Sequence, residues 1–249
     1  KVVEEKGAGY LVLLDPEKLP LPELREVVSQ ISEGGADGIL VGGSTLYSGD
    51  FEEFVSQVKA RSELPVIVFP GGAYQISRSA DAILFLSLIS GRNPQYLIAE
   101  QVSAAPLLKK YGIETIPVGY MLIESGNPTS VQFISSTLPI PREKTEIAVS
   151  HALAAEYLGM RMVYLDGGSG ARSSVPDEMI RAVRDAISVP IIVGGGIRNP
   201  EEASLKVASG ASFVVTGSAT EEEPSVVRDF ARAIHRVKGS ASRSGRRKR

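Results

Sequence analysis

Eight short apolar runs recur along the chain, and each is followed by turn residues and a longer stretch with helical spacing. Runs rich in Val, Ile and Leu are typical of parallel strands that are buried on both faces and joined by crossover helices. Eight strand–helix units in one chain favour closure into a (β/α)8 TIM barrel over an open sheet. The runs are residues 10–15, 38–42, 65–70, 82–87, 115–120, 162–166, 190–195 and 212–217.

The length of the chain suits one barrel domain followed by a short tail. Of its 249 residues, 43% are hydrophobic, which is enough to bury a full core in a single α/β barrel. We therefore predict one domain over residues 1–238. Residues 239–249, GSASRSGRRKR, are polar, basic and rich in Gly and Ser, so we expect them to be disordered. A solvated tail is the favoured interpretation, although attraction to an anionic membrane surface stays open.

Charge and composition exclude several classes of protein. The net charge of −2 lacks the basic field that nucleic-acid binding normally requires. Without cysteine there is no disulfide, thiolate nucleophile or zinc–thiolate cluster. His151 and His235 fall in helical stretches, so we interpret both as structural or surface residues. No apolar run approaches the ~18 residues of a membrane span, and the amino end lacks a signal-peptide layout, so we expect a soluble cytoplasmic protein.

Three glycine-rich turns follow the last three runs: DGGSGA at 166–171, GGGIR at 194–198 and TGS at 216–218. Glycine lets the backbone approach a phosphate closely and aim several N–H donors at it, and a following helix adds its positive end. Any one of these turns alone would be interpreted as a strand exit. Because barrels often place phosphate sites after strands seven and eight, three turns in phase predict one shared anion site. These turns contain no lysine, so backbone dipoles would hold most of the charge.

The first two strands place further polar residues at the same end of the barrel. LLDPEK puts Asp15 at the end of strand one, and VGGST puts Ser44 and Thr45 at the end of strand two. A carboxylate there could hold Mg²⁺, which usually takes one or two protein ligands and completes its octahedron with water and phosphate oxygens. A turn or helix cap at Asp15, which precedes Pro16, is an equally good interpretation.

Taken in order, LLDPEK, VGGST, YLDGGSGA, GGGIR and TGS resemble the motifs of the geranylgeranylglyceryl phosphate synthase family, and they span nearly the whole predicted barrel. The sequence is closer to the branch with a GSGA-type loop after strand six, and a bacterial heptaprenylglyceryl phosphate synthase branch shares the fold. The resemblance implies Mg²⁺-dependent transfer of a geranylgeranyl group from its diphosphate to the 3-hydroxyl of sn-glycerol 1-phosphate. This reaction forms the first ether bond of archaeal membrane lipids.

The same resemblance assigns roles to matching positions. It implies Mg²⁺ on Asp15 and Ser44. The family commonly has Glu at the acidic position of strand six, and this chain has Asp166, whose carboxylate lies one methylene further back. Glycerol phosphate would lie against Tyr164, Leu165, Asp166, Gly167, Gly168, Ser169, Gly170, Gly195, Gly196, Gly217 and Ser218.

Three side chains suit the chemistry of an ionising allylic diphosphate. Asp166 could orient and deprotonate the glycerol hydroxyl. Tyr120, at the end of strand five, could position the substrate or shield the cationic carbon with its ring, and an ordinary strand-end aromatic is an equally good interpretation. Arg92 could contact diphosphate oxygens, although a solvated loop arginine is slightly favoured. Residues 83–90 and 94–108 offer an apolar path for a prenyl chain, and helix-on-barrel packing explains most of them.

Two other functions compete with prenyl transfer. Sugar-phosphate isomerase and lyase barrels also carry glycine-rich phosphate loops, but this chain has no strand-end lysine base. It also has Tyr120 where such an enzyme would place an aspartate to partner Asp15. A non-catalytic barrel that binds a phosphorylated ligand is the third hypothesis. For the prenyltransferase we expect sn-glycerol 1-phosphate and geranylgeranyl diphosphate as substrates, and a homo-oligomer.

Overall fold

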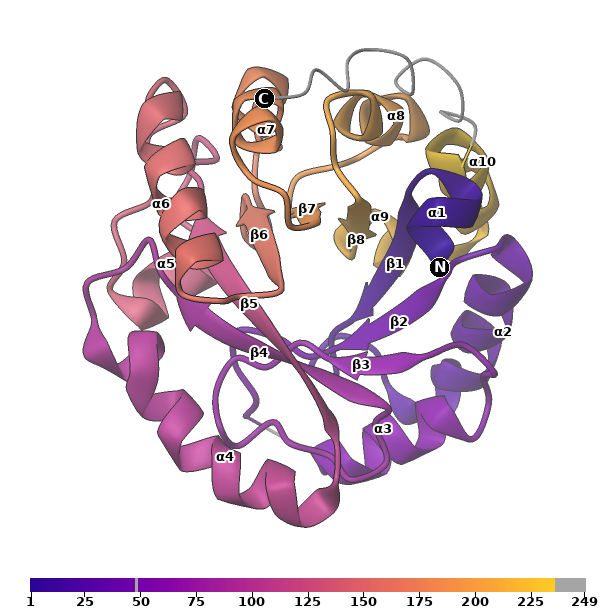
Figure 1. Cartoon of the computed structure of the whole chain (residues 1–249). Helices are drawn as coiled ribbons and strands as arrows, with labels where there is room; N and C mark the ends of the chain where they lie inside the picture. The colour runs from indigo at the N-terminus through magenta and orange to yellow at the C-terminus, as the bar shows by residue number, and fades with distance from the viewer. Residues whose placement is uncertain (48, 236–249) are drawn as a thin grey trace.

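The computed structural model describes residues 1–47 and 49–235, so the predicted tail over residues 239–249 lies outside the described residues. Its strands form a closed parallel barrel in sequence order, with β8 returning to pair with β1 (Figure 1). The predicted TIM barrel is confirmed. The strands are β1 (Gly9–Leu14), β2 (Gly38–Val41), β3 (Val66–Val68), β4 (Ala82–Leu88), β5 (Glu114–Leu122), β6 (Met162–Asp166), β7 (Ile191–Gly194) and β8 (Phe213–Thr216).

Successive residues of each strand point alternately into the barrel and out toward the helices, as the two-residue repeat of a strand requires. On β6, Val163 and Leu165 pack in the outer core beneath the helices, whereas Tyr164 packs inside the barrel. On β5, Tyr120 points inward and Met121 outward. Both faces are therefore buried, which explains why the strands are almost continuously apolar.

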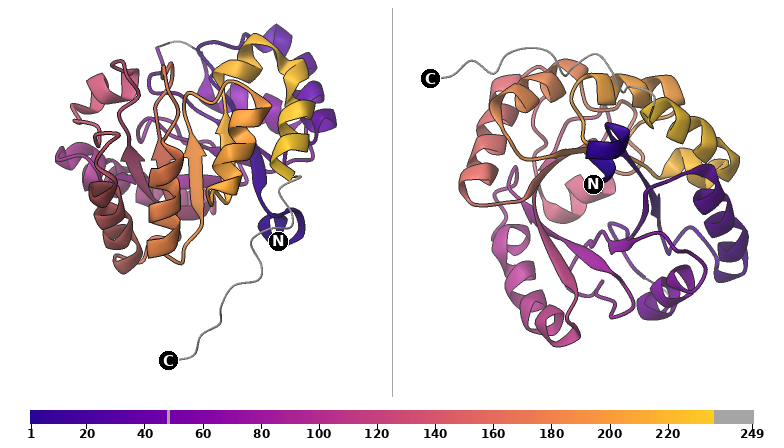
Figure 2. Two further views of the ribbon diagram at one scale, coloured as in Figure 1. Left: turned by 90° about the horizontal axis from the view of Figure 1, so that it is seen from above. Right: turned by 45° about the vertical axis from the view of Figure 1, so that its right-hand side comes forward.

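A ring of helices covers the outside of the barrel (Figure 2). Each buries one apolar face, as α7 does with Met179, Ile180 and Val183, which are fully buried. The main helices are α2 (Leu24–Gly34), α3 (Phe51–Lys59), α4 (Glu100–Tyr111), α6 (Thr145–Tyr157), α7 (Asp177–Ala186), α8 (Pro200–Ala208) and α10 (Val227–His235). Shorter elements are α1 (Val2–Lys6), α5 (Ser130–Ser135), α9 (Ser218–Glu222), the π-helix η2 (Gln95–Ala99) and the 3-10 turns η1 (Leu21–Glu23) and η3 (Pro224–Val226).

The connection between β3 and β4 differs from the prediction, because residues 69–81 contain no helix. This connection is about as short as a crossover can be, and it begins with Pro70 and two glycines, which disfavour helix. Side chains hold it instead. Gln75 accepts from the Gly71 amide at 2.9 Å and donates to the Gly43 carbonyl at 2.9 Å. The loop is thereby fixed against the β2–α3 turn.

The short helix α1 lies against β1 at the amino-terminal end of the barrel (Figure 1). The Asp37 carboxylate, whose side chain is 3% exposed, joins three elements there. It accepts from Lys6 Nζ at 2.5 Å and from the Tyr10 amide at 2.8 Å, and it lies 2.8 Å from His235 Nε2. His151 Nδ1 lies 2.7 Å from the Ile147 carbonyl within α6. Neither histidine lines the main cavity described below, as predicted.

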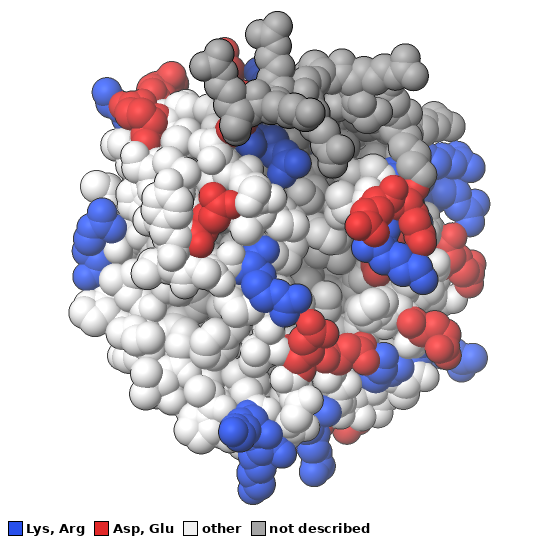
Figure 3. Space-filling model, in the orientation of Figure 1, with Lys and Arg blue, Asp and Glu red and all other residues white. Residues whose placement is uncertain are grey.

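The distribution of charge and the lengths of the helices agree with the composition. On the described part of the face shown in Figure 3, acidic and basic side chains are interspersed. No helix within residues 1–47 and 49–235 is both long and apolar enough to cross a membrane.

Candidate active site

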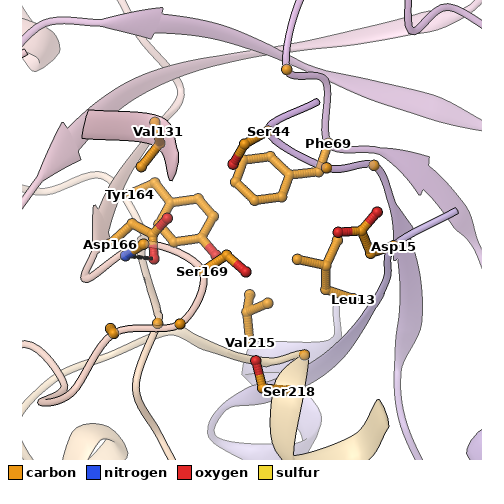
Figure 4. Close-up of a pocket in the computed structure, with 18 of the residues that line it drawn as sticks. Leu13, Asp15, Ser44, Phe69, Val131, Tyr164, Asp166, Ser169, Val215 and Ser218 are labelled. Carbon is orange, nitrogen blue, oxygen red and sulfur yellow. Dashed lines mark hydrogen bonds between the residues drawn. The ribbon is translucent and has the colours of Figure 1, made fainter. Parts of the chain in front are cut away.

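A cavity of about 840 Å³ opens at the carboxyl ends of the strands. Figure 4 shows Tyr164, Asp166 and Ser169 on one side of it and Asp15 and Leu13 on the opposite side. It brings together residues from strands far apart in the sequence, as the barrel topology predicts. The predicted site residues that line it are Asp15, Ser44, Tyr120, Tyr164, Asp166, Gly168, Ser169, Gly170, Gly195, Gly196, Gly217 and Ser218.

Three aromatic rings form one wall of the cavity. The rings of Phe69 and Tyr164 are stacked with centroids 5.3 Å apart, and Tyr120 meets Tyr164 edge-on at 5.5 Å. Burial raises the pKa of both tyrosines well above the usual value, and the nearby Asp166 carboxylate raises it further. Both phenols are therefore protonated near neutral pH, and that of Tyr120 donates a hydrogen bond to Asp166.

Asp166 ends β6 inside this wall and is 5% exposed. Its Oδ2 accepts from the Tyr120 hydroxyl at 2.5 Å, and its Oδ1 accepts from the Gly168 amide at 2.9 Å. Burial raises the pKa of this carboxyl, whereas the Tyr120 and Gly168 hydrogen bonds lower it. Because both known partners are donors, the carboxylate is held in one orientation and has lone pairs left to accept a proton.

Gly195 makes this arrangement sterically feasible. It has φ +78°, and a Cβ at this position would lie 2.6 Å from both Asp166 Oδ1 and the Gly168 nitrogen. Any side chain at this position would collide with the carboxylate and the loop that fixes it. The glycine of the GGGIR turn therefore allows the β7 turn to lie directly against Asp166.

The amides of the three glycine turns are not equivalent. The amide of Gly167 donates to the Gly194 carbonyl at 3.0 Å, and that of Gly168 is bound to Asp166. These two amides are already engaged within the protein. Among the described residues, no protein acceptor contacts the amides of Gly195, Gly196 or Gly217. The turns after β7 and β8 therefore offer main-chain donors to the predicted anion site, as do Ser169 and Gly170 further along the turn after β6, whose amides likewise meet no acceptor among the described residues.

The opposite side of the cavity carries Asp15, which directly follows β1. Its Oδ1 accepts from the Glu17 amide at 3.1 Å, and its Oδ2 lies 4.0 Å from Lys18 Nζ. Burial raises the pKa of the Asp15 carboxyl, since the Glu17 amide and Lys18 compensate only in part. The turn interpretation of Asp15 is confirmed by the hydrogen bond from the Glu17 amide. The same carboxylate also lines the cavity, and its role as a metal ligand stays a prediction.

The protein donors near Asp15 fit a Mg²⁺ ion that is bound chiefly by water and by the phosphate oxygens of a substrate. Within the described ranges, no group of three or more His, Cys, Asp or Glu residues could hold a metal ion. Asp15 and Ser44 both line the cavity, and Gly43, which precedes Ser44, lies so close to the Asp15 carboxylate that an added Cβ would be 2.7 Å from its Oδ1. One carboxylate and one hydroxyl are a sparse set, which suits Mg²⁺ in the presence of a diphosphate.

Three predicted site residues do not line the cavity. Leu165 points into the outer core because it alternates with Tyr164 and Asp166 on β6. Gly167 does not reach the cavity, and its amide donates to the Gly194 carbonyl. Arg92 is exposed, and its Nη1 donates to the neighbouring Gly91 carbonyl at 2.8 Å.

Two cations that line the cavity were not predicted. Lys18 lies 2.9 Å from Glu221 Oε2 and beside Asp15. Arg198 is the last residue of the GGGIR turn, and its Nη2 lies 3.5 Å from the Ala171 carbonyl. Its position in that motif was the available signal, because an arginine next to a glycine-rich turn can reach a bound anion as a lysine can.

Acidic side chains outnumber basic ones in the described lining of the cavity, so its side-chain charge alone disfavours an anion. Its described lining includes four acidic side chains and two basic ones: Asp15, Asp166, Glu221 and Glu223 against Lys18 and Arg198. A phosphorylated ligand therefore depends on backbone dipoles or on an added cation for most of its stabilisation.

Comparison with known proteins gives matches along almost the whole chain. The PcrB family model matches residues 1–238. The chain is 44% identical over 236 residues to a geranylgeranylglyceryl phosphate synthase of Chitinophaga pinensis, with 94% of each chain covered. It is 48% identical over 224 residues to the protein of that name from Thermococcus gammatolerans, with 89% of this chain and 88% of the other covered.

Solved structures agree with this result. The (S)-3-O-geranylgeranylglyceryl phosphate synthase from Thermoplasma acidophilum, in complex with its substrate sn-glycerol-1-phosphate, has a TM-score of 0.88 and is 35% identical. That match covers 95% of this chain and 97% of the other. A thiamine phosphate pyrophosphorylase from Pyrococcus furiosus, with a TM-score of 0.61 and 17% identity, shares the fold alone.

Proposed function

Because this chain belongs to the PcrB family, we propose that it is a prenyltransferase that attaches a geranylgeranyl group to the 3-hydroxyl of sn-glycerol 1-phosphate. The proposed prenyl donor is geranylgeranyl diphosphate, and the proposed cofactor is Mg²⁺. One observation carries this proposal: the buried Asp166 carboxylate lines the same cavity as the amides of Gly195, Gly196 and Gly217, which have no acceptor within the described part of the chain. This arrangement supports a base next to an oxyanion site.

The glycerol phosphate half of the reaction follows from that geometry. The amides of the β7 and β8 turns bind the phosphate, and Arg198 adds a positive charge at the edge of the cavity. The glycerol 3-hydroxyl then donates to Asp166, whose orientation is fixed by Tyr120 and Gly168. As the ether bond forms, Asp166 accepts the hydroxyl proton.

The prenyl half of the reaction is assigned to the side that carries Asp15, Ser44 and Lys18. When bound there, Mg²⁺ supplies Lewis-acid stabilisation of the charge that develops on the departing diphosphate. Lys18 adds a second positive charge to that leaving group. The faces of Tyr164 and Phe69 shield the cationic allylic carbon from water and stabilise it through their π-electrons.

The apolar surface of the cavity provides the path for the prenyl chain. Leu86, Leu88 and Tyr96 line it on the side of β4 and η2, and Val131 approaches from α5. A much smaller cavity of about 30 Å³ lies between the β3–β4 loop and α4, where Ile76 and Ala104 line it. The helix-free β3–β4 connection therefore borders both cavities, which supports this side as the route of the chain.

Purified protein incubated with geranylgeranyl diphosphate, sn-glycerol 1-phosphate and Mg²⁺ tests the proposed function. We expect diphosphate release that requires both substrates and stops when EDTA removes the metal. A sugar-phosphate isomerase or lyase, or a non-catalytic binding barrel, would release no diphosphate. Release without glycerol phosphate would instead indicate simple hydrolysis and contradict the transfer reaction.

Substitution of Gly196 by valine should raise the KM for glycerol phosphate. Gly196 has φ +73°, and a Cβ there would lie 2.8 Å from the Ser173 carbonyl carbon, so the turn must move and its amide with it. The matched control is Gly159→Val, because Gly159 has φ +82° with nothing within 4 Å of the added Cβ. It carries the same backbone strain without the collision. Equal KM values in the two variants would argue against the proposed phosphate turn.

Substitution of Tyr120 by phenylalanine should move the acid limb of the pH–rate profile to higher pH. Asp166 acts as a base only when ionised, and its pKa is already raised by burial. The Tyr120 hydrogen bond lowers that pKa, so its loss raises the pKa further and activity disappears at a higher pH as the solution is acidified. The control is Tyr164→Phe, which removes a neighbouring phenol that makes no hydrogen bond to Asp166 among the described contacts. An unchanged limb in Tyr120→Phe would exclude Asp166 as the titrating base.

The expected homo-oligomer stays a prediction. The exposed side chains of Phe133, Leu138 and Tyr157 are the apolar groups that a subunit contact could cover.

A further inference from the structure

The loop after β6 and the turn after β7 touch each other through their backbones, outside the cavity. A Cβ on Gly196 would lie 2.9 Å from the Ser173 carbonyl oxygen and 2.9 Å from the Ser174 nitrogen. Any shift of the loop at Ser173 and Ser174 is therefore passed directly to Gly196. The amide of Gly196 is one of the donors assigned to the phosphate, so the separation of these two segments sets the geometry of the anion site.

The carboxylate of Glu202, in the first turn of α8, contacts both segments. Its Oε1 accepts a short hydrogen bond from the Ser174 hydroxyl, and its Oε2 accepts from the Arg198 amide at 3.0 Å. Ser174 is 6% exposed, so its bond to Glu202 is largely shielded from water. Among the described contacts, Glu202 joins the β6–α7 loop to the β7–α8 turn through two hydrogen bonds, and Arg198 Nη2 adds a longer contact of 3.5 Å with the Ala171 carbonyl.

Neighbouring contacts hold the same loop but leave the turn after β7 untouched. Lys206, which is 4% exposed, donates to the Val175 carbonyl and to Asp177, both at 2.8 Å. Arg142 donates to the Ser174 carbonyl at 2.8 Å. These contacts fix the end of the loop against α8 and the β5–α6 segment. The Gly167–Gly194 backbone hydrogen bond joins the start of the loop to β7, and Glu202 joins the loop to the turn at Ser174, next to the place where Gly196 approaches it.

We propose that Glu202 is a positioning residue for the glycerol phosphate site, which it shapes by clipping the β6–α7 loop to the β7–α8 turn through Ser174 and Arg198. It lies outside the cavity lining and touches no substrate. The inference rests on the proposed function, because it concerns the affinity of that same site for glycerol phosphate. Loss of the clip lets Gly196 and the loop move apart, and main-chain donors misplaced by fractions of an ångström bind the phosphate less well.

Calorimetric titration of sn-glycerol 1-phosphate into the protein, without prenyl diphosphate, measures this effect directly. We expect Glu202→Ala to raise the dissociation constant roughly 10- to 100-fold while the KM for geranylgeranyl diphosphate stays unchanged. The matched control is Glu201→Ala. Glu201 is exposed and is also acidic in the first turn of α8, so its loss removes the same helix-dipole stabilisation without the clip.

Two further variants separate the clip from a general loss of folding. Glu202→Gln should largely restore affinity, because its amide can accept from Arg198 and donate to the Ser174 hydroxyl oxygen. Ser174→Ala should weaken binding, and the double variant Ser174→Ala/Glu202→Ala should bind no worse than Glu202→Ala alone, since both remove one interaction. Ser174→Ala keeps the test informative even if Glu202→Ala does not fold.

The outcomes distinguish this inference from the proposed function. If the unaltered protein binds no glycerol 1-phosphate, the proposed function fails. If it binds the ligand, and Glu202→Ala and Ser174→Ala bind it as tightly as Glu201→Ala does, the positioning role is overturned while the function stands. Additive losses in the double variant would likewise overturn the clip.

Discussion

Asp166→Asn should reduce kcat about 10²- to 10⁴-fold, the range for losing a general base, while glycerol 1-phosphate binds as tightly as before or more tightly. The asparagine keeps the shape of the side chain and can still accept from Tyr120 or Gly168. It lacks the charge that takes the proton. It also removes a buried negative charge beside the phosphate, which is why affinity should not fall. Turnover and calorimetric binding, measured on the same preparation, give the two numbers.

The control for Asp166→Asn is Asp229→Asn on α10, where the side chain is 67% exposed and far from the cavity lining. This variant should keep both its turnover and its affinity. A parallel loss of binding and turnover in Asp166→Asn would mean that the residue shapes the site without acting as the base. Retention of near-normal kcat would exclude it from catalysis altogether.

Asp15→Asn should reduce turnover by at least about 10²-fold at moderate Mg²⁺, since a metal ion stabilises the transition state by several kcal/mol. Asparagine can keep the hydrogen bond from the Glu17 amide, so the turn should persist while the anionic ligand is lost. We expect raised Mg²⁺ to restore part of the activity and the dissociation constant of glycerol 1-phosphate to stay unchanged. Initial rates over a Mg²⁺ series measure this.

Asp185→Asn, an exposed substitution on α7, is the matched control and should follow the unaltered Mg²⁺ dependence. Loss of activity in Asp15→Asn that no Mg²⁺ concentration relieves, together with a lower melting temperature, would indicate a structural role as the turn cap. Near-normal activity at every concentration would exclude Asp15 as a metal ligand.

Much of the barrel was predictable because each strand is buried on both faces. Continuous apolar runs such as residues 190–195 mark parallel strands, and eight of them leave little alternative to closure. The exception is the β3–β4 connection. It has a turn-rich sequence, and only the tertiary contacts of Gln75 with Gly43 and Gly71 show how it is held without a helix.

The site was predictable where it depends on backbone freedom, and less so where it depends on side-chain direction. The glycines of the late turns were identified because only glycine tolerates the close approach found at Gly195. The family motif implies a contact at Leu165 because it runs unbroken from Tyr164 to Gly170, but strand alternation turns the Leu165 side chain outward. Arg92 was included for its charge, but its loop directs it away from the cavity.

Residues that act through a partner distant in sequence could not be found from motifs. Glu202 is one acidic residue in the first turn of a helix, where such residues are common for dipole reasons alone. Its contact with Ser174 spans 28 positions. Phe69 is similar, because its stacking on Tyr164 depends on how β3 and β6 are placed across the barrel.

A crystal structure with bound sn-glycerol 1-phosphate tests most directly where the acceptor substrate lies. We predict phosphate oxygens at about 2.7–3.2 Å from the amides of Gly195, Gly196 and Gly217, with the 3-hydroxyl directed at Asp166. Two results would contradict the account: a phosphate bound beside Asp15 and Lys18, or amides that are hydrogen-bonded to other protein groups. Either would overturn the assignment of the base, of the glycerol phosphate site and of the diphosphate site.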